Sequence, residues 1–182
     1  AQDGGFVELQ NGTTITEATE MDGSNLMLCG SGAQIVLADD SVLITGNALR
    51  STGSVFFLEA GSASKILIRG AKIQDNTLDS GYVLQCIDDA TLDYCVSGNA
   101  YIYDNTNAAG EQRNIFLAND PGSYNTGTCL ISVAGALGAN AKIGIFSQTA
   151  PDNTADYAVI DIAKSYDGNI TWGTDESPMP AY

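Results

Sequence analysis

The pentapeptide IQDNT at Ile73–Thr77 returns as IYDNT at Ile102–Thr106. Each copy follows a short apolar run and a glycine, which is Gly70 in the first case and Gly98 in the second. A shorter version of the same arrangement precedes them, with Gly46 after an apolar run. The equivalent glycines would then recur every ~24–28 residues, a period typical of repeat architectures.

A unit of this length, built of short strands and turns, cannot bury its own apolar face, whereas stacking on the next copy can. The apolar runs are β-branched and separated by small polar residues, which favours strands over helices. The repeat therefore predicts an all-β solenoid. Asn76 and Asn105 would occupy equivalent corners, where the side-chain amides of successive coils can stack in a ladder. The alternative is that two unrelated turns share the sequence Asp-Asn-Thr.

The composition is that of a single acidic domain. A chain of 182 residues with 44% hydrophobic content can bury a continuous core. Its net charge of −15, from 22 acidic against 7 basic side chains, argues against nucleic acid and against an anionic membrane surface as partners. Solubility of a secreted protein explains this charge. No run approaches the ~20 apolar residues of a membrane-spanning helix, so no membrane insertion is expected.

The cysteines and the first residues favour an extracellular or cell-surface location. Ala1-Gln2 could be the end left by removal of a signal peptide, although an artificial boundary would look the same. The four cysteines lack the paired spacing of zinc sites, and the chain has no histidine. Cys86 and Cys95 are close enough in sequence to form a disulfide, which leaves Cys29 and Cys129 as the second pair. Four buried thiols in a solenoid core are the alternative.

We expect one domain in three parts. Residues 1–25 are predicted to be N-terminal cap strands, residues 26–150 the coils, and residues 151–182 a terminal β-hairpin and tail. The hairpin is expected because residues 157–162 alternate as a strand does and Asp167-Gly168 is a favoured hairpin turn. No helix is expected, since residues 134–141 are too rich in glycine.

Four runs in the second half of the chain resemble the last coils of a known family. They are residues 98–106, 113–117, 131–137 and 141–145. Their order and spacing resemble those of right-handed parallel β-helix domains in large adhesin-like surface proteins of bacteria and archaea. The resemblance covers roughly residues 42–172 and implies a right-handed parallel β-helix with a non-enzymatic adhesive or structural role outside the cell. Because the chain is short for such a protein, it is either a fragment or a smaller separate subunit.

Catalysis has to be weighed because many β-helix proteins act on polysaccharides. A glycosidase needs two carboxylates flanking one bond, and the adjacent acidic pairs are Asp39-Asp40 and Asp88-Asp89. A solvated turn is the more common role of such a pair. Arg69 and Lys72 are candidates for the base of a lyase, but no motif around them supports that role. The lack of histidine excludes a serine–histidine triad. We therefore predict no enzyme, no catalytic residue and no cofactor.

Structural calcium stays open, and one tyrosine pair could contact sugars. Turns such as Asp75–Thr77 and Asp152-Asn153 offer oxygen ligands, although their spacing matches no calcium-binding motif. Tyr101 and Tyr103 would both point outward if Ile102 points into the core. They could form a glycan-binding platform, or they could pack only against each other or a loop.

The leading hypothesis is an extracellular structural or adhesive subunit that associates end to end with copies of itself, as in a filament. It is motivated by the ends of a solenoid, which expose strand edges and apolar core unless they are capped or paired. The alternatives are a monomeric module that binds host or matrix glycans and, third, a polysaccharide-active enzyme.

Overall fold

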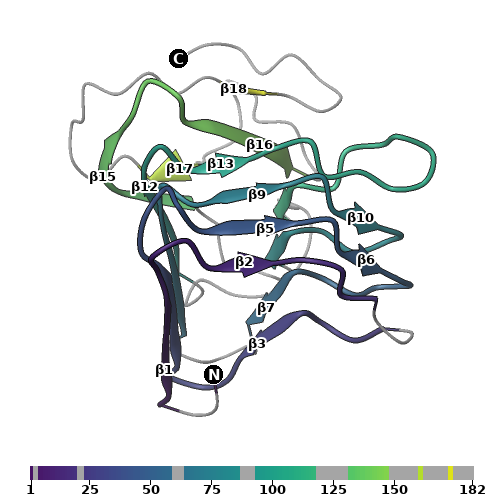
Figure 1. Ribbon diagram of the computed structural model, residues 1–182, viewed down its shortest axis with the longest axis horizontal. Helices are drawn as coiled ribbons and strands as arrows, with labels where there is room; N and C mark the ends of the chain where they lie inside the picture. Colours follow the sequence, from purple (N-terminus) through teal and green to yellow (C-terminus); the bar gives the residue numbers. More distant parts are fainter. Residues whose placement is uncertain are drawn as a thin grey trace, which may run out of the picture.

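The computed structural model of the chain is an all-β solenoid of about four turns, which confirms the predicted parallel β-helix. It describes residues 1, 4–19, 23–58, 64–86, 93–117, 131–147, 160–161 and 172–173. Every regular element within these residues is a strand. The coils stack from the purple first coil at the bottom of Figure 1 to the green strands at the top.

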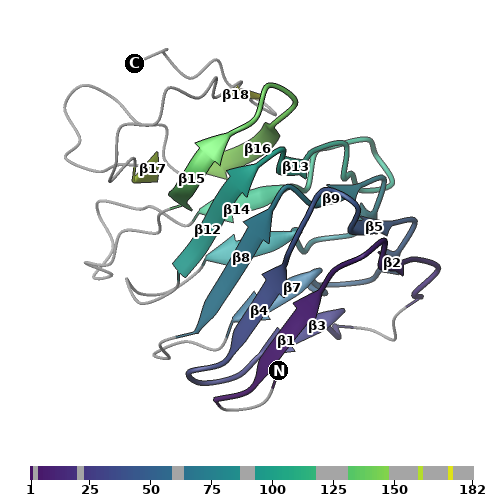
Figure 2. The ribbon, with the colours of Figure 1, turned by 60° about the vertical axis from the view of Figure 1, so that its left-hand side comes forward.

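The strands of successive coils form three faces, which the two ribbon views show from different sides (Figures 1 and 2). The first face is a six-stranded sheet of β1 (Phe6–Leu9), β4 (Gln34–Leu37), β8 (Lys65–Arg69), β12 (Asp93–Gly98), β15 (Ile131–Leu137) and β17 (Ile160–Asp161). The second face holds β2 (Thr14–Ile15), β5 (Leu43–Thr45), β9 (Lys72–Gln74), β13 (Tyr101–Ile102), the start of β16 (Lys142–Ser147) and β18 (Trp172–Gly173). The third face holds β3 (Met27–Cys29), β7 (Phe56–Leu58), β11 (Leu84–Cys86), β14 (Ile115–Leu117) and the end of β16. A short pair, β6 (Ala48–Leu49) and β10 (Thr77–Leu78), lies beyond the second face.

Each strand lies parallel to its neighbour in the next coil, so that equivalent side chains stack in rows. On the second face, the row that points inward consists of Ile15, Ile44, Ile73, Ile102 and Ile143. Ile44, Ile73 and Ile102 have no exposed surface. Because side chains alternate across a strand, one residue in two enters the core, and each fully buried isoleucine contributes about 1.5–3 kcal/mol.

The corner after the second face is turned by one left-handed residue in each of the first four coils. These residues are Glu17, Gly46, Asp75 and Asp104, with φ of 59°, 67°, 54° and 59°. Aspartate enters this conformation more readily than most residues because its short side chain can form local hydrogen bonds. At Asp75, a carboxylate oxygen accepts a hydrogen bond from the side-chain amide of Gln74 at 2.7 Å.

The register corrects one expectation about the repeat. Gly70 does lie beside Gly98, since Arg69 pairs with Ser97 at the end of the first face. Gly46 instead matches Asp75, because Thr45 pairs with Gln74 on the second face. The apolar run before Gly46 and the run before Gly70 therefore belong to different faces. Both are β-branched runs that end in glycine, and this pattern alone does not distinguish one face from another.

An asparagine follows three of the left-handed corner residues and forms a buried ladder. Nδ2 of Asn47 donates to Oδ1 of Asn76 at 2.8 Å, and Nδ2 of Asn76 donates to Oδ1 of Asn105 at 2.7 Å. Asn105 in turn donates to Asn114 at 2.8 Å. The Nδ2 groups of the first three asparagines also donate to main-chain carbonyl oxygens. The amides are therefore buried without losing their hydrogen bonds, as burial of polar groups requires.

Asn114 enters the ladder from outside the repeat. It lies nine residues from Asn105 in the chain and immediately precedes β14. The coil above has no corner here, because β16 runs straight from a pairing with β13 to a pairing with β14. Gly144, in the middle of β16, lies against this amide: a Cβ there would be 2.6 Å from Nδ2 of Asn114. The glycine therefore leaves the space that the last asparagine occupies.

The prediction of a terminal hairpin is wrong for the strands that the structure describes. Ile160–Asp161 (β17) pairs in parallel with β15 on the first face, and Trp172–Gly173 (β18) pairs in parallel with β16 on the second. The two strands thus continue the solenoid instead of pairing with each other. The turn predicted at Asp167-Gly168 lies outside the described residues. An Asp-Gly turn is a local signal, whereas the parallel pairing depends on the coil beneath it.

The N-terminal strands form a first coil with the same register as those above. β1 pairs with β4, β2 with β5, and β3 with β7. The boundary expected between cap strands and coils therefore falls inside this coil, just before its third strand. A turn at Asn11-Gly12 connects the first two strands.

Candidate functional site

The acidic pair Asp39-Asp40 lies at an exposed corner of the second coil. Oδ1 of Asp39 accepts hydrogen bonds from the hydroxyl and, at 2.9 Å, from the main-chain N–H of Ser41, and Oδ2 accepts one from the N–H of Asn11 at 3.3 Å. These bonds, the one from the Ser41 hydroxyl first, lower the pKa of Asp39. A carboxylate held in its ionised form suits a structural turn and does not suit a general acid.

The other residues considered for catalysis do not gather into one constellation. Arg69 is an exposed residue at the end of β8 on the first face, whereas Lys72 is exposed on the second face. Lys72 does share a hollow with Asp40, so the structure brings together one acid and one base from the sequence. The pair Asp88-Asp89 lies outside the described residues.

Structural calcium stays open, as do the two alternatives for the cysteines, disulfides or buried thiols. Among the described residues, no group of three or more acidic, histidine or cysteine side chains is placed to hold a metal ion, and Asp152-Asn153 lies outside them. Cys29 is fully buried, and its thiol donates to the carbonyl oxygen of Ala33 at 3.2 Å. Cys95 is buried on the first face. The side chain of Cys86 and all of Cys129 lie outside the described residues.

Tyr101 and Tyr103 both point outward from the second face, while Ile102 between them is fully buried. Their rings meet edge to face, with centroids 6.4 Å apart and an interplanar angle of 77°. Nζ of Lys142 lies 3.4 Å from the centroid of Tyr103 and 5.9 Å from that of Tyr101. The two rings do not form a flat platform, because their planes are nearly perpendicular, and the ammonium of Lys142 lies over Tyr103.

Tyr101 is held by its hydroxyl. The hydroxyl donates to Oδ2 of Asp104 at 2.8 Å. Partial burial, this hydrogen bond, and the nearby carboxylates of Asp104 and Asp75 raise the pKa of Tyr101 to about 12. The phenol therefore stays protonated at neutral pH, and its ring is fixed in orientation.

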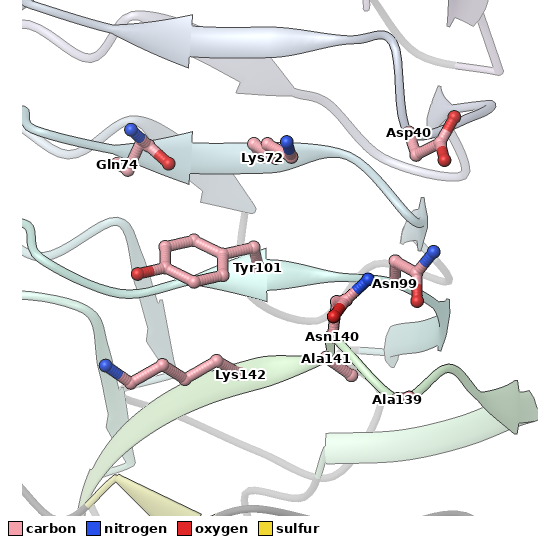
Figure 3. A pocket seen from close by; sticks show the side chains of 9 residues that line it. All are labelled: Asp40, Lys72, Gln74, Asn99, Tyr101, Ala139, Asn140, Ala141 and Lys142. Atoms are coloured by element: carbon pink, nitrogen blue, oxygen red, sulfur yellow. The ribbon is translucent and has the colours of Figure 1, made fainter.

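Next to this ring the second face is hollowed. The hollow has a volume of about 560 Å³ and is lined by Asp40, Lys72, Gln74, Asn99, Tyr101, Ala139, Asn140, Ala141 and Lys142. Figure 3 shows Tyr101 between the strands that carry Lys72 and Lys142. The asparagines and Asp40 lie toward the end where these strands begin. Side chains alternate along β9, β13 and β16, and this alternation places Lys72, Tyr101 and Lys142 on the outer surface. The parallel register of the three strands places these three side chains in one row.

A second aromatic group was not predicted from the sequence. On the third face, Tyr82 stacks on Phe116 with centroids 4.9 Å apart, and Phe116 stacks on Phe146 at 5.6 Å. The guanidinium carbon of Arg113 lies 5.2 Å from the centroid of Tyr82, and Nη1 donates to the Tyr82 hydroxyl at 2.9 Å. The faces of these rings pack against one another, which is the role that outward-facing aromatic side chains commonly have.

We call the end of the solenoid at the first coil the open end. Its inward-facing side chains are partly exposed: Val7, Leu9, Ile15 and Met27. Val7 has 37% of its surface exposed, whereas its neighbours in the same row, Ile35 and Ile66, have 1% and 0%. The difference arises because each inner coil packs against a coil on either side. In the described part of the chain, the first coil packs only against the coil above it.

The strand edges of the open end are paired mainly on one side. The exception is at β3, where the amino group of Ala1 donates to the carbonyl oxygen of Leu28 at 2.5 Å and the carbonyl oxygen of Ala1 accepts from the N–H of Gly30 at 2.9 Å. Among the described strands, β1, β2 and β3 each have one partner, in the coil above. Their outward-facing side chains add apolar surface, since Phe6 is 60% exposed and Leu28 is 48% exposed. Unpaired N–H and C=O groups beside apolar side chains are a template for further strand pairing.

No protein-family model, curated protein or solved structure matches the chain. The resemblance to adhesin-like β-helix domains therefore remains an expectation from the order and spacing of its runs. In the part of the chain that the structure describes, there is no helix of the length and apolarity needed to cross a membrane.

Proposed function

We propose that this chain is a non-enzymatic structural or adhesive module, outside the cell or at its surface, that associates end to end with further copies of itself. The observation that carries the proposal is the exposure of Val7 at a position where the inner coils are buried. A second copy would supply the missing coil. It would pair the free edges of β1 and β2 and cover the open end.

The two kinds of surface at the open end favour a strand-forming partner over an unstructured one. Edge N–H and C=O groups need partners at the ~4.8 Å strand spacing, and the inward side chains need an apolar neighbour. The terminal coil of another solenoid provides both at once. A head-to-tail contact along the solenoid axis does not close into a ring, so its repetition would build a filament.

The net charge of −15 opposes this association and predicts its salt dependence. Copies of such a chain repel one another over about the Debye length, which falls from ~30 Å at 0.01 M salt to ~8 Å at 0.15 M. Association should therefore strengthen with added salt, unlike the binding of a basic protein to an acidic partner.

The test is the mass of the purified chain in solution, measured by light scattering over a wide range of concentrations and followed by electron microscopy. We expect the mean mass to rise with concentration beyond that of a dimer, and fibres to be visible. Val7→Lys places a charge at the open end and should return the protein to a monomer. Ser80→Lys, in an exposed turn after β10, adds the same charge elsewhere and should leave the mass unchanged.

Two outcomes would overturn the proposal. One is a monomer at every concentration and salt condition. The other is association that Val7→Lys and Ser80→Lys reduce equally, since it would then depend on charge in general and not on the open end. Circular dichroism of both variants establishes that each retains the β-solenoid.

A further inference from the structure

The hollow on the second face has features that end-to-end association does not use. It lies on the side of the solenoid, spanning β9, β13 and β16, and not at the open end (Figure 3). Its volume of about 560 Å³ lies within the range of roughly 300–1,000 Å³ that small-molecule sites occupy. A site here could therefore be filled whether or not the chain polymerises.

The hollow concentrates positive charge in an acidic chain. The sequence has 7 basic residues against 22 acidic ones, and two of the seven, Lys72 and Lys142, line this one surface. They lie in the same outward row as Tyr101, one on the strand before it and one on the strand after it. Neighbouring strands are about 4.8 Å apart, so a ligand of one or two sugar rings would span the row.

The two lysines have different surroundings. The ammonium of Lys142 is already placed against the ring of Tyr103 at 3.4 Å. Lys72 is exposed, and within the described residues its side-chain ammonium has neither a hydrogen bond nor an ion pair. The cation available to an incoming anion is therefore Lys72, while Lys142 keeps the tyrosine pair in position.

The rest of the lining offers hydrogen-bond donors and acceptors together. The side chains of Asn99 and Asn140 contribute amides at the corner of the hollow, and Asp40 contributes a carboxylate. Gly138 leaves room for Asn99, since a Cβ there would be 1.9 Å from Oδ1 of that side chain. A ligand rich in hydroxyl groups can donate to Asp40 and accept from the amides. A sulfate ion can only accept, so Asp40 would disfavour it.

We propose that the hollow binds a carboxylate-bearing saccharide, with one sugar ring against Tyr101 and the carboxylate paired with Lys72. The aromatic ring supplies an apolar surface for the C–H face of the sugar, and the hydroxyl groups of the sugar reach the asparagines and Asp40. Neutral saccharides lack the partner for Lys72. Nucleic acids would need a longer basic track than these two lysines provide.

The experiment is calorimetric titration of the full chain with trigalacturonic acid, with neutral galactotriose and with acetate as the other probes. We use the Val7→Lys variant as well as the natural sequence, so that end-to-end association cannot mask binding and the two proposals are tested separately. Trigalacturonic acid is expected to bind at least tenfold more tightly than galactotriose. Acetate, which has the carboxylate but no sugar ring, is expected to bind too weakly to compete.

Three variants locate the site. Lys72→Gln should weaken trigalacturonic acid about tenfold and leave galactotriose unchanged, while Tyr101→Ala should weaken both saccharides. Lys65→Gln, an identical change on the first face, should have no effect. Equal affinity for the acidic and neutral saccharides, competition by acetate, or equal losses from Lys72→Gln and Lys65→Gln would each overturn the proposal. So would the absence of binding by a chain that is folded.

Discussion

The first and third coils place side chains in the same rows but surround them differently. Ile15 on β2 and Ile73 on β9 belong to one inward row of the second face. Ile73 has no exposed surface, whereas Ile15 is only partly buried at the open end. The backbone conformation and the residue type are the same in both places. Burial in this protein is therefore conferred by the neighbouring coils and not by the coil itself.

The corners of the same two coils differ in residue type as well. Asn76 in the third coil is buried and bonded to the coil on each side. Its counterpart in the first coil is Ala18, whose main-chain N–H donates to Oδ1 of Asn47 at 3.1 Å. The asparagine ladder thus stops one coil before the open end. Because no described coil lies beneath Ala18, a side-chain amide there could donate to Asn47 above it but would have no carboxamide below it from which to accept.

The largest expected effect comes from deleting the same isoleucine side chain in the two coils. Ile73→Ala should lower the free energy of unfolding by about 2–5 kcal/mol, because it leaves a cavity between two packed coils. Ile15→Ala should cost roughly 1 kcal/mol, since its side chain is partly solvated before the change. Urea denaturation of both variants measures the difference. Equal losses would show that the first coil is as well packed as the third, which would also remove the basis for the proposed assembly.

The ladder gives the next largest effect. Asn76→Ala removes the acceptor for Asn47 and the donor for Asn105 and leaves two buried main-chain carbonyls without that partner. We expect a loss of about 2–3 kcal/mol, the cost of unsatisfied buried polar groups.

Asn140→Ala is the matched control for this change because it removes the same side chain from an exposed position. It should change the free energy of unfolding by less than about 0.5 kcal/mol. If the urea midpoints of the two variants coincide, the side chain of Asn76 contributes no net stability to the folded protein.

The regular part of the ladder could be predicted from the sequence, and the irregular part could not. Asn76 and Asn105 follow identical turns, and their hydrogen bond joins residues 29 apart. Asn47 was missed because the run before Gly46 was matched to the wrong face. Asn114 could not be predicted from the repeat, because it lies only nine residues after Asn105 in the chain and therefore does not follow the spacing of the other asparagines.

The candidate site shows the same division. Alternation of side chains along one strand was enough to place Tyr101 and Tyr103 on the outer surface with Ile102 inside. The cation on Tyr103 could not be predicted, because Lys142 reaches it from the next strand of the second face. Residues 118–130, between β14 and β15, are about twice as many as residues 59–64, between β7 and β8, so the spacing in the sequence does not give the register of Lys142 with Tyr101. Sequence periodicity carries no information across such an interruption.

The smallest expected effect would extend the ladder into the first coil. Ala18→Asn places a carboxamide at the corner after Glu17, where it could accept from the main chain or donate toward Oδ1 of Asn47, as the asparagines above do. Because Ala18 is only partly buried, the expected gain is about 0.5–1 kcal/mol in the free energy of unfolding, that of a single net hydrogen bond. Urea denaturation of the Val7→Lys, Ala18→Asn double variant measures it in a monomer, with Val7→Lys alone as the reference. A loss of stability would show that the open end lacks the room that the inner corners give an asparagine, and that the first coil ends the ladder for steric reasons.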